Sequence, residues 1–163
     1  MKVLLFPDSV LREKSQKITT LDDKILNFIH ELQLLMYSSK GCVGIAAPQV
    51  GEHKRIVIAD VSNHKKAVDK NGLLVMINPV IIEASGAVIN REGCLSVPDY
   101  TGNVQRPDRI KVRFTDIKGV EKELGTSGFE AVVIQHEMDH LDGILFIDRI
   151  TNTRADLFKR KQY

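Results

Sequence analysis

Two histidines four residues apart, His136 and His140, constrain this chain more than any other feature, because Glu137 stands between them. In a helix this spacing places both imidazoles on one face, where they can bind one metal ion with the carboxylate beside it. Residues 131–134, which precede the pair, are all apolar, so the pair is expected to be partly buried, where unpartnered polar groups are costly. A bound metal ion would give the two buried imidazoles the polar partner that they need. The alternative is an amphipathic helix with two surface histidines.

The pattern of apolar residues predicts two helices separated by short strands. Apolar side chains recur with helical spacing over residues 22–39, with Thr20 as the candidate N-cap. The second helix is expected to begin with a capping box over residues 127–130 and to end at Gly143. Between the helices, runs such as 110–115 alternate between apolar and polar residues, as half-buried strands do. The predicted fold class is α+β, with short antiparallel strands wrapped around a central helix that carries the two histidines.

The length and the net charge of the chain limit the classes of protein to which it can belong. Its 163 residues are enough for one core, and residues 1–163 are expected to form a single catalytic domain. A net charge of +2 gives no reason to expect specific binding of nucleic acid or of an anionic membrane. The one basic run, Lys159-Arg160-Lys161, is expected to be a solvated tail. The apolar run before Pro7 is too short for a signal peptide or a membrane span, so the expected location is cytoplasmic.

A catalytic metal site usually has three protein ligands and a water, so a third ligand is expected. One known arrangement takes a histidine six residues after the second one, where this chain has Phe146, and another takes a later glutamate, but none follows Glu137. The third ligand is therefore expected upstream. Cys94, next to Gly93, is the best candidate, because a thiolate is a strong ligand and glycine lets the backbone come close. A buried structural thiol is the alternative for Cys94 and the expected role of Cys42, and both are expected to be free.

Three segments, in this order along the chain, resemble the peptide deformylase family. They are Gly44-Ile45-Ala46-Ala47-Pro48-Gln49, Glu92-Gly93-Cys94-Leu95-Ser96 and Gln135-His136-Glu137-Met138-Asp139-His140. The resemblance implies a bacterial-type hydrolase of protein biosynthesis, which removes the formyl group from the N-terminal formylmethionine of newly made polypeptides and releases formate. Ferrous iron is the divalent ion that the family favours, with Zn²⁺, Ni²⁺ or Co²⁺ as substitutes. Besides the nascent chains, the ribosome is a candidate partner.

The chemistry of formyl removal suits these residues. The expected metal ligands are Cys94, His136 and His140. The metal would lower the pKa of a bound water, and Glu137 is expected to take the water proton and return it to the departing amine. The resemblance adds Gln49, through its side-chain amide, and Leu95, through its backbone N–H, as donors to the developing oxyanion. A donor of this kind contributes about 2.7–4 kcal/mol in a comparable site.

The resemblance also implies that the substrate lies as an added strand along the loop at Gly44, with its methionine side chain in an apolar pocket. The residues expected to bind it are Val43, Gly44, Ile45, Phe129, Val132 and Val133. Core packing is an equally good explanation for Phe129, Val132 and Val133. Glu92 and Arg106 are expected to pair and to support the loop that carries Cys94.

Two other interpretations stay open from the sequence. One is a metallopeptidase with an upstream cysteine ligand. The other is a non-enzymatic domain in which Cys94, His136 and His140 form a closed structural zinc site. Glu137 argues against the zinc domain, because a structural site needs no base.

Overall fold

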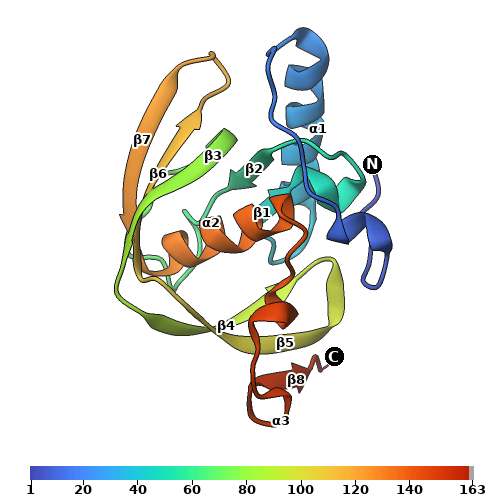
Figure 1. The fold of residues 1–163 in the computed structure, drawn as a ribbon, viewed down its shortest axis with the longest axis vertical. Helices are drawn as coiled ribbons and strands as arrows, with labels where there is room; N and C mark the ends of the chain where they lie inside the picture. Colours follow the sequence, from blue (N-terminus) through green and yellow to red (C-terminus); the bar gives the residue numbers. More distant parts are fainter. Residues whose placement is uncertain (162–163) are drawn as a thin grey trace.

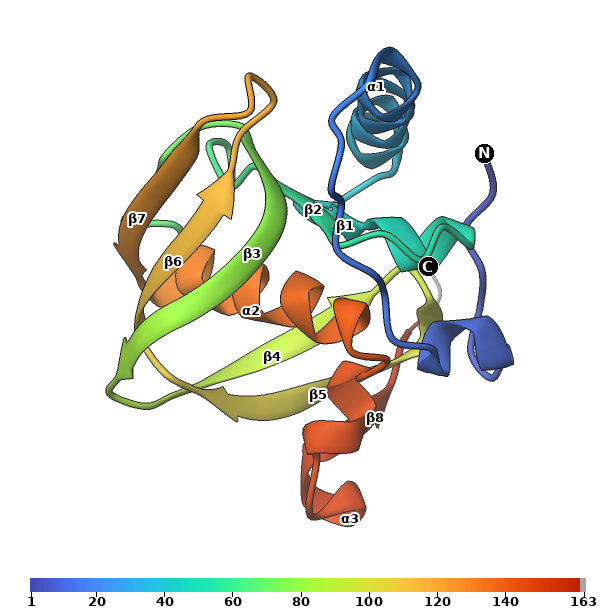
Figure 2. The same cartoon turned by 45° about the horizontal axis from the view of Figure 1, so that its top comes forward.

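One helix, α2 (Gly128–Leu141), lies between two antiparallel sheets in the computed structural model, which describes residues 1–161 (Figure 1). Its side chains Ala131, Ile134 and Leu141 are fully buried and pack with strand residues in one apolar cluster. In the turned view of Figure 2 the larger sheet covers one side of α2, and the hairpin of β4 (Val88–Cys94) and β5 (Val97–Arg106) covers the other. The predicted α+β class, with antiparallel strands around a central helix, is confirmed.

The larger sheet has the strand order β1-β2-β3-β6-β7. Its strands are β1 (Gly44–Ala46), β2 (Ile56–Ala59), β3 (Leu74–Ser85), β6 (Arg109–Thr115) and β7 (Glu121–Ser127). Within residues 1–161, β1 pairs only with β2 and so has an open edge. Asn78 and Pro79 do not interrupt β3, because its register with β6 shifts there and Asn78 takes a φ of 52°. The strand thus passes the proline through a bulge.

The smaller sheet joins the middle of the chain to its end. Its strands, in the order β4-β5-β8, are β4 (Val88–Cys94), β5 (Val97–Arg106) and β8 (Leu157–Lys159). β8 pairs with β5 at residues 100–102, and the N–H of Arg160 donates to the carbonyl of Asp99 at 2.8 Å. Lys159 and Arg160 are exposed, as predicted, but they do not form a free tail, because they follow the edge of this sheet.

Short elements and an extended arm complete the described chain. The short elements are the 3₁₀ helices η1 (Ser9–Arg12), η2 (Ala47–Val50) and η3 (Phe146–Arg149), and the helix α3 (Thr153–Asp156). In the arm, the N–H of Leu4 donates to the carbonyl of Gln49 at 2.7 Å, and that of Phe6 donates to the carbonyl of Ser96 at 2.8 Å. The arm thereby ties η2 to the β4–β5 turn. No helix among residues 1–161 is long and apolar enough to cross a membrane.

The first helix, α1 (Asp23–Ser38), has the predicted extent but a different start. Asp22, not Thr20, is its N-cap, and its carboxylate accepts a hydrogen bond from the N–H of Ile25 at 2.9 Å. The apolar stripe of α1 packs on strand residues of the larger sheet in a second core cluster. This cluster holds up the sheet edge to which β1 belongs.

The predicted capping box at the start of α2 is wrong. Ser127 occupies the N-cap position, but its side chain makes no capping bond and donates instead to Asp69 at 2.7 Å. Glu130 is 1% exposed and accepts hydrogen bonds from Thr126, at 2.8 Å, and from Asn71. Ser127 and Glu130 thus bond to residues of the 62–72 loop and of β7. The start of α2 is therefore fixed by tertiary contacts.

We expect Leu32→Ala to lower the free energy of unfolding by about 2–5 kcal/mol, because Leu32 is 0% exposed between α1 and the sheet and its truncation leaves a cavity. Leu34→Ala on the same helix is the control. That side chain is 54% exposed, and its loss should change stability by less than about 0.5 kcal/mol. Urea unfolding of both variants measures the difference, and equal losses would contradict the assigned face of α1.

Candidate metal centre

Three metal-ligand side chains meet where the end of β4 faces α2. The ligand atoms of Cys94, His136 and His140 lie within 4.8 Å of one another, and all three residues are buried. The Sγ atom of Cys94 is 3.3 Å from Nε2 of His140. A tetrahedral ion bound by a thiolate and an imidazole would hold these two atoms about 3.5 Å apart. The donor set and its spacing therefore fit a divalent metal.

Local structure explains why the three residues converge. His136 and His140 are one turn apart on α2, with ring centroids 5.3 Å apart. Cys94 is the last residue of β4, and the register of the β4–β5 hairpin shifts between Gly93 and Cys94. This irregularity ends the regular ladder beside the cysteine, as bulges near functional sites do.

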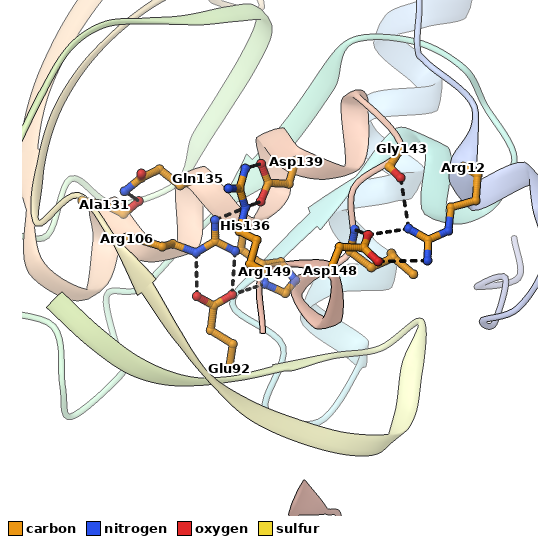
Figure 3. Close-up of polar contacts among 11 residues, drawn as sticks. Arg12, Glu92, Arg106, Ala131, Gln135, His136, Asp139, Gly143, Asp148 and Arg149 are labelled. Carbon is orange, nitrogen blue, oxygen red and sulfur yellow. Dashed lines mark hydrogen bonds and ion pairs between the residues drawn. The ribbon is translucent and has the colours of Figure 1, made fainter. Parts of the chain in front are cut away.

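A buried carboxylate, Glu92, orients the first of these histidines (Figure 3). Nδ1 of His136 donates to Glu92 at 2.7 Å, which leaves Nε2 free to bind a metal. Arg106 donates to both oxygens of Glu92, at 2.6 and 2.8 Å. Burial by itself would raise the pKa of Glu92, but the hydrogen bonds from Arg106 and His136 outweigh it and hold the pKa below its usual value. The predicted pairing of Glu92 with Arg106 is confirmed.

A second carboxylate, Asp139, extends this network one turn further along α2. Arg106 donates to it at 2.9 Å, and Arg149 of η3 donates at 2.5 and 2.7 Å (Figure 3). The ion pairs thereby join α2 to β5 and to η3. Sequence analysis missed Asp139 and Arg149. The signal available in the sequence was an acidic residue in a helix whose preceding turns, residues 131–134, are apolar.

The surrounding charges act differently on the two histidines. Burial lowers the pKa of His136, but hydrogen bonds with Cys94 and Glu92 outweigh it, so this pKa is raised well above its usual value. Burial lowers the pKa of His140 as well, and the positive charges of His136 and Arg106 add to that effect. The negative charges near His136 attract a cation, and the neutral imidazole of His140 can bind one through its lone pair. Both features suit a bound metal ion.

Glu137 lies on the same face of α2 and is 5% exposed. Its Oε2 atom has no hydrogen-bond partner among the described residues. A Cβ atom on Gly44 would lie 2.8 Å from its Oε1 atom, so only glycine fits at that position of β1. Burial is the main reason that the pKa of Glu137 is raised to about 7; the charges of His136 and Arg106 oppose this shift, and those of Glu92 and Asp139 add to it. A carboxylate with this pKa can take up and release a proton near neutral pH.

Gln49 reaches the same place from η2 and is 2% exposed. Its Oε1 atom accepts a hydrogen bond from the N–H of Ala46 at 2.9 Å. Its amide nitrogen donates to Oγ of Ser96 at 3.1 Å and lies 3.5 Å from Sγ of Cys94. The amide donor is thus held on the metal side of the site. Leu95, the other predicted donor, lies in the turn directly after β4.

A cleft of about 240 Å³ opens beside these groups. The predicted substrate residues that line it are Val43, Gly44, Phe129, Val132 and Val133, together with Leu95. The Ile45 side chain is 0% exposed and belongs to the core cluster under α1, so it does not line the cleft, and a role for Ile45 in substrate binding would fall to its backbone. Successive side chains of a strand point to opposite faces, which turns Ile45 away when Gly44 faces the cleft.

The mouth of the cleft carries residues to which the sequence analysis gave no part in the site. They are Lys40, His64, Lys66, Arg91 and Arg160. The His64 ring stacks on Phe129 with centroids 4.1 Å apart, so the 62–72 loop covers one end of the cleft. Arg160 reaches the cleft only because β8 pairs with β5, and local sequence carries no signal for that pairing.

The second cysteine, Cys42, lines the cleft without joining the metal ligands. Both cysteines are free thiols, as predicted. The Cys42 thiol donates to the carbonyl of Gly44 at 3.1 Å. Burial, followed by the charge of Glu137, raises the pKa of Cys42 to about 12, so it stays a neutral thiol at physiological pH.

Comparisons with known proteins agree on one family. The family model described as polypeptide deformylase matches residues 1–156. The peptide deformylase of Desulfotalea psychrophila is 38% identical over 99% of this chain and 94% of its own, and that of Picosynechococcus is 43% identical over 95% and 81%. The crystal structure of peptide deformylase from Thermotoga maritima superposes with a TM-score of 0.84 at 38% identity, covering 93% of this chain and 97% of the other.

We expect Glu92→Gln to weaken metal binding by about 10–100-fold, because the amide removes the negative charge that His136 and Arg106 share. Titration with Zn²⁺ against a competing chelator measures the affinity. Glu83→Gln is the control, since that side chain is 73% exposed on β3. Unchanged affinity in Glu92→Gln would show that the carboxylate does not support the metal site.

Proposed function

The chain belongs to the polypeptide deformylase family, and on that premise we propose how its residues carry out the metal-dependent removal of the formyl group from a polypeptide N-terminus. The observation that carries the proposal is the buried Glu137 carboxylate, which has an unpartnered oxygen and lines the cleft beside the three clustered ligands. Membership of this family does not favour a metallopeptidase or a structural zinc domain.

Proton transfer is the task of Glu137. A divalent ion bound by Cys94, His136 and His140 would act as a Lewis acid and lower the pKa of a water molecule. Glu137 accepts the water proton and delivers it to the methionine nitrogen as the formyl C–N bond breaks, so the water oxygen leaves in formate and the peptide leaves as an amine. Burial, which favours the protonated carboxyl and raises its pKa, supports the return of the proton.

Charge that develops on the formyl oxygen is stabilised by two donors, the side-chain amide of Gln49 and the backbone N–H of Leu95. The fixed amide of Gln49, which faces Cys94 and is held by Ala46, supports this role, because a preorganised donor needs no rearrangement during the reaction.

The peptide binds along the open edge of β1, with backbone hydrogen bonds to the strand that contains Gly44. Its methionine side chain occupies the apolar part of the cleft formed by Val43, Phe129, Val132 and Val133. Ile45 contributes only through its backbone. The absence of a Cβ at Gly44 brings the bound peptide close to Glu137.

The proposal also names the metal ion, the substrates and the place in the cell where the enzyme meets them. The ion is Fe²⁺, and Zn²⁺, Ni²⁺ or Co²⁺ can take its place, since thiolate and imidazole ligands accept all of these metals. The substrates are nascent N-formylmethionyl polypeptides, met in the cytoplasm and at the ribosome. Residues 1–163 act as one catalytic domain.

Replacing the base tests the mechanism. We expect Glu137→Ala to lower formate release from a formylmethionyl tripeptide by about 10²–10⁴-fold while the metal content stays the same, because the carboxylate moves protons and binds no metal. Glu31→Ala, on the exposed face of α1, is the control. Absence of formate from the fresh, anaerobically prepared ferrous enzyme would disprove the function. Loss of metal and fold in Glu137→Ala would favour a structural site.

Replacing the thiol tests the ligand set. Cys94→Ser should lose most of its iron or zinc on dialysis, because a serine hydroxyl is a poorer ligand for these ions than a thiolate. The matched control is Cys42→Ser, whose thiol contacts a carbonyl and stays outside the ligand cluster. Metal analysis of both variants decides the matter, and full retention of iron by Cys94→Ser would contradict the assignment.

A further inference from the structure

Four exposed basic side chains stand around the mouth of the cleft: Lys40, Lys66, Arg91 and Arg160. The acidic residues of the same lining are Glu92 and Glu137, and both are buried. Glu92 is already bound to Arg106 and His136, and Glu137 serves the chemistry. The part of the cleft that faces solvent therefore carries positive charge.

The structure holds Arg160 at a defined position next to the metal ligands. Its backbone N–H donates to the carbonyl of Asp99 at 2.8 Å, directly after β8 has paired with β5. A Cβ atom on Gly93 would overlap the Arg160 guanidinium, so the side chain occupies the space that this glycine leaves. Gly93 directly precedes Cys94. The charge of Arg160 thus lies against the end of β4, which carries the proposed ligand Cys94.

Arg91 is fixed on the same wall of the cleft. Its guanidinium lies over the ring of Phe158 in β8, 3.8 Å from the ring centroid, and its Nε donates to Oγ1 of Thr101 at 3.1 Å. Side chains that are already ordered lose less conformational entropy when they bind a ligand. β8 therefore positions both arginines before any peptide arrives.

Within residues 1–161 none of these four basic residues forms a salt bridge with a carboxylate. Five other arginines do, and they are Arg12, Arg55, Arg106, Arg113 and Arg149. The chain thus neutralises most of its arginines elsewhere and leaves the charges at the cleft mouth available to a ligand. The planar guanidinium of arginine matches a carboxylate through two parallel hydrogen bonds.

We propose that this rim gives the enzyme a preference for formylated chains with an aspartate or glutamate in the first few residues after methionine, with Arg160 as the main contact. The inference rests on the proposed deformylase function and names the substrate class of the same site. A peptide is favoured over nucleic acid, because the four charges surround the cleft opening and the net charge of the chain is only +2.

The test compares kcat/KM for two C-terminally amidated peptides, formyl-Met-Ala-Glu and formyl-Met-Ala-Gln, which differ by one charge. We expect the metal-loaded enzyme to prefer the glutamate peptide by about twofold to fivefold at low salt, as exposed ion pairs allow. The preference should shrink as salt is added. In Arg160→Gln the ratio should fall toward one, and Arg160→Lys should restore part of it.

Arg154→Gln is the matched control, because Arg154 lies exposed on α3 in the same terminal segment and outside the cleft lining. It should keep the preference of the parent enzyme. Equal kcat/KM values for the two peptides in the parent enzyme would overturn the inference while leaving the deformylase function intact. Loss of ribosome binding in Arg160→Gln with an unchanged peptide ratio would overturn it in favour of phosphate recognition. Absence of formate from both peptides would refute the underlying function instead.

Discussion

The buried carboxylate of Glu92 is the interaction on which the rest of the site depends. It receives hydrogen bonds from His136 on α2 and from Arg106 on β5, and it belongs to the strand that ends at Cys94. One charged group therefore sets the distance between the helix and the hairpin and the orientation of a metal-binding ring. Loss of a partner from such a buried ion pair costs about 3–5 kcal/mol, because the remaining charge is left uncompensated. Such a pair suits a site in which a metal needs its ligands in one geometry.

Close approach of the backbone is the second constraint. Gly44 leaves room for the Glu137 carboxylate, and Gly93 leaves room for the Arg160 guanidinium. Both glycines lie in strands that border the cleft, where a side chain would occupy the space of Glu137 or of Arg160. A strand with an open edge can then bring a peptide backbone next to the buried base.

Much of the fold and of the candidate site was predictable from local patterns in the sequence. Helical spacing identified both helices, and the paired histidines with Glu137 pointed to a metal site before any fold was known. Cys94 followed from the lack of a downstream donor. The errors share a cause. The capping box at Ser127 failed because Glu130 bonds to Asn71 from a distant loop, and Arg160 was taken for part of a tail because strand pairing with β5 cannot be read from a basic run.

The sequence by itself determined the fold class and the family, and it predicted the three ligand residues and the proposed base. These follow from side-chain identity and from spacing of a few residues, which the helical repeat converts directly into geometry. Only the tertiary structure decided which side of β1 faces the cleft, how Asp139 and Arg149 brace the helix, and that the chain end returns to the cleft mouth. Those features depend on contacts between residues far apart in the chain, which local propensity does not encode.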